Sequence, residues 1–118
     1  MQRRRLMLAL ASTAALPFTA RAAAPMVEIW KDPNCGCCQD WVKHLNRNGF
    51  ATRVHDEGNA AARKRLGLPE KLGSCHTGQV GGYAIEGHVP AREIQRLLKE
   101  KPRAVRLAVP GMPVGSPG

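Results

Sequence analysis

The chain has 118 residues, a formal net charge of +9 and only 4% aromatic residues. This length provides one small domain and leaves no room for a second. The basic residues are scattered apart from Arg63-Lys64-Arg65, whereas a nucleic-acid surface needs a basic stripe with aromatic stacking platforms. The composition therefore excludes nucleic acid as the expected partner and predicts a charged, soluble surface.

The first 22 residues have the features of a secretory signal peptide. Arg3-Arg4-Arg5 is followed by an apolar run over residues 6–16, and Ala20-Arg21-Ala22 resembles a cleavage site. The run is shorter than the roughly 20 residues of a membrane-spanning helix. We expect cleavage after Ala22 and export without a membrane anchor, which leaves 96 residues with a formal charge of +5. Arg3-Arg4 also loosely fits a twin-arginine signal, so both export routes stay open.

The next segment predicts a strand followed by a helix. Residues 26–31 alternate in polarity and read as a strand, and residues 32–34 are typical of a turn. Apolar residues then recur at the spacing of one helical face, and Asn48-Gly49 ends that helix. The residues predicted to face the core are Cys38, Trp41, Val42 and Leu45.

The rest of the chain predicts alternating strands and helices. A second strand is expected over residues 50–55 and a short helix over residues 59–67. A hairpin is expected from residue 79, with its turn at Glu86-Gly87, and a last helix begins at Pro90. The buried face of that helix is predicted to consist of Ile94, Leu97 and Leu98.

This order of elements predicts an α/β fold, a small thioredoxin-like domain over residues 23–107. We expect a central mixed sheet of three to four strands with flanking helices. Residues 108–118 are dense in proline and glycine and lack periodicity. They are expected to form a tail that covers a surface and contains no element of its own.

Three of the four cysteines lie within residues 35–38, at the predicted start of the first helix. Cys35 and Cys38 have the Cys-x-x-Cys spacing of redox domains, where the helix N-terminus favours thiolate over thiol. Cys37 is a third sulfur that a single disulfide does not need. The cluster therefore indicates a metal site, with a structural or redox disulfide as the alternative in an oxidising compartment.

Cys75 and His76 lie in a segment of small and polar residues that we expect to form a loop beside the cysteine-bearing helix. This placement predicts a metal site made of Cys35, Cys37, Cys38, Cys75 and His76. Thiolates select Cu(I), zinc or iron–sulfur centres. Four cysteines can bridge more than one Cu(I), whereas zinc needs a closed tetrahedron of thiolates, with or without an imidazole. Adjacent cysteines favour the bridged copper arrangement, and zinc stays the alternative.

Several motifs resemble one known family. They are residues 31–38, residues 72–77, residues 81–91 and the ending over residues 109–118. Together they resemble the CopG-type copper-resistance proteins, bacterial periplasmic metal-binding proteins long classed as a domain of unknown function. The resemblance covers nearly the whole mature chain. It implies a periplasmic protein with a thioredoxin-like fold and a copper site held by Cys35, Cys37, Cys38 and Cys75.

The resemblance also implies a role in copper resistance, a Cu(I)/Cu(II) interconversion activity and contact with other periplasmic copper-handling proteins. Two other functions stay open from the residues alone. One is a thiol–disulfide oxidoreductase that uses Cys35 and Cys38, and the other is a binding module stapled by zinc or a disulfide. Among the other candidate donors, His88 is expected to be structural or solvent-facing, His44 and His55 to lie on the surface, and Met112 to pack the tail.

Overall fold

The structure, a computed structural model, describes Pro17 and residues 25–118. Apart from Pro17, the signal peptide predicted over residues 1–22 lies outside the described residues. The described part contains strands, three α-helices and a short 3₁₀ helix, η1. In chain order these are β1 (Met26–Lys31), α1 (Gly36–Arg47), β2 (Ala51–His55), α2 (Ala60–Arg65), η1 (Glu70–Leu72), β3 (His76–Val80), β4 (Tyr83–Gly87), α3 (Ala91–Glu100) and β5 (Arg106–Val109).

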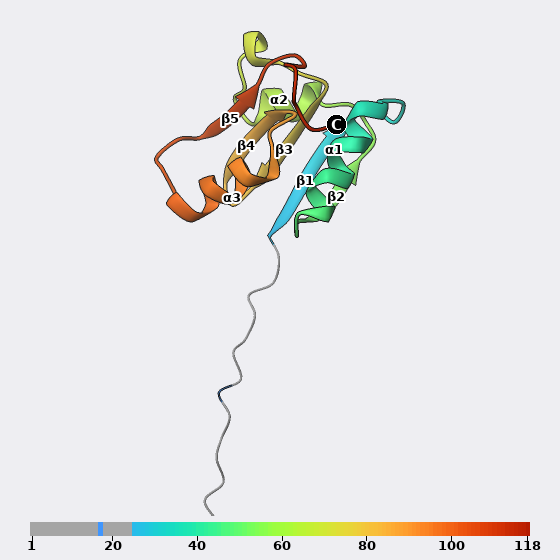
Figure 1. The fold of residues 1–118 in the computed structure, drawn as a ribbon. Helices are drawn as coiled ribbons and strands as arrows, with labels where there is room; N and C mark the ends of the chain where they lie inside the picture. Colours follow the sequence, from blue (N-terminus) through green and yellow to red (C-terminus); the bar gives the residue numbers. More distant parts are fainter. Residues whose placement is uncertain (1–16, 18–24) are drawn as a thin grey trace, which may run out of the picture.

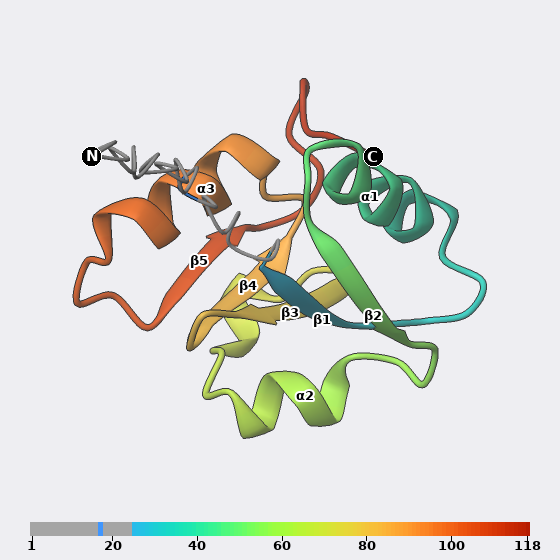
Figure 2. The ribbon, with the colours of Figure 1, turned by 90° about the horizontal axis from the view of Figure 1, so that it is seen from below.

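The strands form one mixed sheet in the order β2-β1-β3-β4-β5 (Figure 1). The β1–β2 and β4–β5 pairs are parallel, and β3 runs antiparallel to both of its neighbours. Helices α1 and α3 cover one face and α2 covers the other (Figure 2). The predicted α/β fold with a mixed sheet and flanking helices is therefore confirmed, with five strands in place of three to four. The assignment of this fold to the thioredoxin-like domains stays a prediction.

The core lies between the sheet and the α1–α3 layer. Val27 and Ile29 project from β1 towards this layer and are fully buried, because alternate residues of a strand share a face. Trp41 and Leu45 on α1 and Ile94 on α3 fill the same core. The helical periodicity of the sequence thus correctly identified the buried faces of α1 and α3.

The hairpin turn was predicted at the wrong place. The turn falls at Gly81 and Gly82, whose φ angles are +54° and +82°, and not at Glu86-Gly87. Two consecutive positive φ angles suit the tight turns that join antiparallel strands, and glycine adopts them without strain. His76, expected in a loop, accordingly begins β3.

A fifth strand occupies the start of the predicted tail. β5 pairs in parallel with β4, and its last two residues lie beyond the expected boundary at residue 107. Leu107 and Val109 pack against the core. This packing explains why the segment forms a strand although Pro110 and Gly111 follow it directly. The chain then crosses from β5 to the start of α1, where Gly118 lies (Figure 1).

Gly87 is expected to be intolerant of substitution. Its φ angle is +80°, and a Cβ atom there would overlap the carbonyl oxygen of Val109 on β5 and lie 3.1 Å from the Ser74 side chain. Gly87→Ala should lower the free energy of unfolding by about 2–3 kcal/mol, because it adds overlap to backbone strain. Gly82→Ala is the matched control, since φ is +82° there but nothing lies within 4 Å of the Cβ position. Urea unfolding should give a loss of about 1 kcal/mol for that control; equal losses would contradict the role of the β5 contact.

Candidate metal centre

The first helix begins inside the cysteine cluster. Cys35 is the N-cap residue of α1, and its sulfur accepts a hydrogen bond of 3.3 Å from the backbone N–H of Cys38. This bond satisfies one of the N–H groups that a helix start leaves without a partner. Cys37 lies in the first turn with its side chain partly exposed, whereas Cys38 is fully buried. The strand–turn–helix sequence therefore holds three sulfurs at the positive end of a helix dipole.

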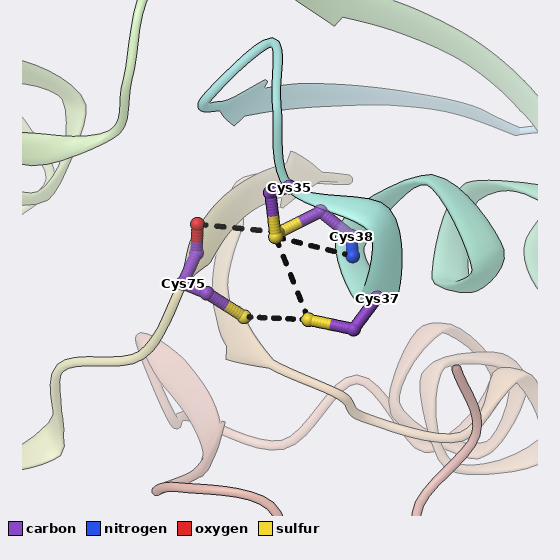
Figure 3. Close-up of side chains that lie close together, drawn as sticks. All are labelled: Cys35, Cys37, Cys38 and Cys75. Atoms are coloured by element: carbon purple, nitrogen blue, oxygen red, sulfur yellow. Dashed lines mark hydrogen bonds between the residues drawn. A yellow bond between two sulfur atoms is a disulfide. The ribbon is translucent and has the colours of Figure 1, made fainter.

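Cys35 and Cys38 are joined as a disulfide, and Cys37 and Cys75 are free (Figure 3). The Cα atoms of the bonded pair are 5.3 Å apart, within the usual range for a disulfide. The Cys37 sulfur lies 3.5 Å from that of Cys35. Both chemistries considered for the Cys-x-x-Cys pair thus fit this geometry, because reduction would turn the disulfide into two thiol ligands.

Cys75 brings the fourth sulfur from a distant part of the chain. It directly precedes β3, and its sulfur lies 3.8 Å from that of Cys37 (Figure 3). Its carbonyl oxygen lies 3.4 Å from the sulfur of Cys38. The four sulfurs all lie within 4.8 Å of one another. The structure therefore brings the two predicted cysteine segments together.

A buried carboxylate holds the segment that carries Cys75. Glu86 on β4 is fully buried and accepts hydrogen bonds from the backbone N–H of Ser74 at 2.8 Å and from the hydroxyl of Thr77 at 2.6 Å. The side-chain amide of Asn59 donates to the Ser74 carbonyl at 3.0 Å, and the side chain makes no capping hydrogen bond to α2 although Asn59 directly precedes that helix. Bonds on both sides of Cys75 thus fix its position.

The register of the β3–β4 hairpin places a histidine opposite Cys75. The turn at Gly81-Gly82 pairs Val80 with Tyr83 and Thr77 with Glu86, and continuing this register sets Cys75 against His88. The two side chains do meet, with the Cys75 sulfur 3.2 Å from His88 Nε2. His88 is fully buried, so the solvent-facing alternative expected for it is wrong, and its side chain lies in the cluster beside Cys75. The misplaced turn explains the error, because only the Gly81-Gly82 turn gives this register.

Two backbone carbonyls orient the imidazoles of the cluster. The His76 Nε2 donates to the Gly87 carbonyl at 2.6 Å, and the His88 Nδ1 donates to the Pro117 carbonyl at 2.7 Å. Since a carbonyl oxygen only accepts, these bonds assign the proton on each ring. His76 Nδ1 and His88 Nε2 therefore present lone pairs to the Cys75 sulfur, at 3.6 and 3.2 Å. Carbonyl-bonded rings of this kind are typical of metal-binding histidines.

Burial shifts the pKa values of His76 and Cys75 towards their uncharged forms. Burial, assisted by repulsion from His88, lowers the pKa of His76 to about 4, although its bond to Gly87 acts in the opposite direction. Its ring also stacks on Trp41, with the ring centroids 4.1 Å apart. Burial raises the pKa of the Cys75 thiol, which the Ser74 hydroxyl partly offsets. A metal ion binding here would therefore displace protons from thiols.

The structure thus gathers all five predicted ligands into one region and adds His88. Cys75, His76 and His88 form a second donor group whose ligand atoms lie within 4.8 Å of one another. The other candidates lie apart from these groups. His55 stacks on Trp30, Met112 is half exposed, and His44 contacts the start of α3.

His44 acts as a cap, which predicts a pH dependence of stability. Its Nε2 accepts the N–H of Ala91 at 3.0 Å at the start of α3. Burial first, and Arg47 second, lower the pKa of His44 below 6.5. Because the pKa is lowered in the folded state, this stabilisation is complete above pH 6.5 and is lost as the pH falls through the folded pKa. His44→Ala should lower the free energy of unfolding by about 1 kcal/mol at neutral to alkaline pH, the usual cost of losing a cap.

Denaturation at a series of pH values checks this prediction. The difference between the wild type and His44→Ala should shrink as the solution is acidified, since a protonated Nε2 cannot accept a hydrogen bond. A difference that is constant across pH would contradict the capping role.

Comparisons with known proteins give consistent matches. Residues 72–118 match a family model described as a protein of unknown function, DUF411. A solved structure named copper resistance protein CopG, form 2, is 50% identical, covers 80% of this chain and 76% of its own, and superposes with a TM-score of 0.74. Form 1 is 52% identical, with 78% and 74% covered and a TM-score of 0.72. No curated protein matches significantly.

Among the described residues, no helix is long and apolar enough to cross a membrane.

Proposed function

Because the chain belongs to the CopG family of copper resistance proteins, we propose that it binds copper through Cys35, Cys37, Cys38 and Cys75 and so contributes to copper tolerance. The convergence of four sulfurs from two segments supports this proposal most directly. The decisive distance is the 3.8 Å between the sulfurs of Cys37 and Cys75. A structural disulfide in the first segment would need neither of these residues.

The donor set fits Cu(I) as cargo. Cu(I) is satisfied by two or three soft ligands, and a thiolate can bridge two ions. Four sulfurs within 4.8 Å of one another, beside two imidazoles, offer more donors than a single Cu(I) needs. The full set is available only when Cys35 and Cys38 are reduced. We therefore propose that the reduced chain holds a thiolate-bridged group of Cu(I) ions.

The ions would reach the cluster from the partly exposed side of Cys37 and Cys75, where a copper-donating or copper-accepting partner could approach. Export to the periplasm is part of the proposal and is supported by the signal-peptide features of residues 1–22. Sequestration is the role that the donor set supports. A change of copper valence, which the sequence resemblance implied, would need an electron donor or acceptor in addition.

Anaerobic titration of the reduced protein with Cu(I) tests the proposal. We expect tight uptake of more than one Cu(I) per chain, and an X-ray absorption spectrum with a Cu(I) edge and a shell of sulfur neighbours. Cys37→Ser should reduce the stoichiometry, because it removes the sulfur that lies within 3.5 Å of the Cys35 sulfur and 3.8 Å of the Cys75 sulfur. No tight uptake, or uptake that Cys37→Ser leaves unchanged, would refute the copper centre.

The disulfide between Cys35 and Cys38 favours one rival, a thiol–disulfide oxidoreductase. Its position at a helix N-terminus is the one that such enzymes use. That function would require Cys35 and Cys38 but not Cys75. Reduction of an insulin disulfide at a rate that Cys75→Ser and chelators leave unchanged would favour the rival over copper binding.

A further inference from the structure

The donor group of Cys75, His76 and His88 contains neither cysteine of the disulfide. Disulfide formation removes Cys35 and Cys38 as thiolate ligands, but it leaves one thiol and two oriented imidazoles in the same pocket. The free thiol of Cys37 stands beside them, 3.8 Å from Cys75. The disulfide form of the chain therefore keeps a donor set that differs in kind from the one proposed for Cu(I).

The distances in this group suit a tetrahedral ion. Zinc binds sulfur at about 2.3 Å and imidazole nitrogen at about 2.0–2.1 Å, so a tetrahedron has edges of about 3.5 Å between sulfur and nitrogen and about 3.8 Å between two sulfurs. The Cys75 sulfur lies 3.6 Å from His76 Nδ1 and 3.2 Å from His88 Nε2. It lies 3.8 Å from the Cys37 sulfur. All three separations are close to the edges of one coordination tetrahedron.

The rings are also held in the form that coordination requires. The carbonyls of Gly87 and Pro117 accept hydrogen bonds from the protonated ring nitrogens of His76 and His88. The other nitrogen of each ring therefore faces Cys75 before any ion binds. Such outer partners orient metal ligands, and their loss typically costs about 10–100-fold in metal affinity. The two hydrogen bonds that orient the rings for an ion therefore involve neither cysteine of the disulfide.

We propose that the chain with its Cys35–Cys38 disulfide binds one divalent ion of the zinc type through Cys75 Sγ, His76 Nδ1 and His88 Nε2. The fourth position lies open to water or to Cys37. This site shares Cys75 with the proposed copper centre but belongs to the oxidised chain. Its test uses no copper, so either proposal can fail without the other.

Titration of the oxidised full chain with Co(II), a spectroscopic substitute for zinc, tests the site. Peptide mapping first verifies the disulfide. We expect one Co(II) per chain, the intense visible bands of a tetrahedral ion and a thiolate charge-transfer band, all abolished by added zinc. The Cys35→Ser/Cys38→Ser double variant, which permanently lacks these two thiols, should bind in the same way.

His88→Gln should weaken binding by more than the roughly 10–100-fold that loss of an outer partner costs. The matched control is His55→Gln, because His55 stacks on Trp30 away from the cluster and should leave the affinity unchanged. Absence of Co(II) binding by both the oxidised chain and the double variant would overturn the proposal. Equal affinities for His88→Gln and His55→Gln would do the same.

Nitrogen NMR of the histidine rings gives a readout that needs no variant and so does not depend on whether a substituted chain folds. Adding zinc to the oxidised wild type should move the resonances of His76 Nδ1 and His88 Nε2 to the range of metal-bound nitrogens. The opposite nitrogen of each ring should stay protonated, because a backbone carbonyl holds it. Unchanged ring resonances, or coordination through the opposite nitrogens, would contradict the assignment.

Discussion

Replacing Cys75 by serine should lower the number of Cu(I) ions that the reduced chain binds tightly and weaken the remaining binding by at least about 100-fold. Cys75 supplies the only sulfur of the cluster from outside α1 and its cap, and it lies between Cys37 and His88, at 3.8 and 3.2 Å. A 100-fold loss corresponds to about 2.8 kcal/mol of binding free energy. Losing a ligand should exceed the 10–100-fold typical of an outer partner. Competition titration with a Cu(I) chelator of known affinity measures the effect.

The matched control for this experiment is Met112→Leu. Met112 also carries sulfur but is half exposed in the chain segment after β5, and its removal should leave the stoichiometry unchanged. Cys75 is partly exposed and serine is similar in size, so Cys75→Ser should fold normally. Wild-type copper uptake by a folded Cys75→Ser chain would show that the first cysteine segment binds copper alone.

Removing the Glu86 side chain should cause the largest loss of stability. Glu86→Ala would leave the Ser74 N–H and the Thr77 hydroxyl without their acceptor and Arg63, 3.9 Å away, without its nearest buried carboxylate. Each buried donor left without an acceptor typically costs about 1–3 kcal/mol, so the total loss should be about 3–5 kcal/mol. Urea unfolding of the metal-free chain measures this cost. The loosened Ser74 should also weaken Cu(I) binding, because it precedes the ligand Cys75.

Glu86→Gln separates the hydrogen bonds from the charge. Its amide oxygen can still accept from Ser74, so we expect a loss of only about 1 kcal/mol. Burial raises the pKa of Glu86 above its ordinary 4.5, against the opposing effects of Thr77, Ser74 and Arg63. A raised folded pKa gives stability that is complete below pH 4.5 and declines as the pH rises through the folded value. Glutamine resembles the protonated acid and does not titrate. The free energy of unfolding of the wild type should therefore fall relative to that of Glu86→Gln as the pH rises. A difference that instead grows in favour of the wild type would contradict the direction of the pKa shift.

The first half of the fold could be predicted from local pattern. Residues 26–31 form the predicted strand, and the four apolar positions of α1 are its buried residues. Both patterns work because these elements present one face to a core, so their period is visible in the sequence. The convergence of Cys35, Cys37 and Cys38 with Cys75 could also be predicted, since it follows from the order of strands and helices.

His88 could not be placed because its position depends on a single turn. Both Gly81-Gly82 and Glu86-Gly87 are plausible turn sequences, and a different turn changes every cross-strand neighbour. Glu86 is also buried although carboxylates are usually exposed, and its hydrogen-bond partners come from two separate segments, Asn59 and residues 74–77. The signal that could have revealed His88 is the two-residue Gly-Gly hairpin, which sets Cys75 and His88 opposite each other.

β5 was missed for a different reason. Its four residues, Arg106–Val109, are too few to show an alternating pattern, and Pro110 follows directly. Leu107 and Val109 become strand residues only because β4 offers them a free edge and the core offers them a place to pack. This is tertiary context that local propensity does not contain.

The amide proton of Cys38 is hydrogen-bonded to the Cys35 sulfur, so its chemical shift should report the chemical state of that sulfur. Its acceptor is a disulfide sulfur in one form of the chain, and would be a thiol, a thiolate or a copper-bound sulfur in others. These acceptors differ in charge, so the proton resonance should move with each of them. In a nitrogen-15-labelled chain, one peak of an amide correlation spectrum should therefore follow oxidation and copper loading without an added dye.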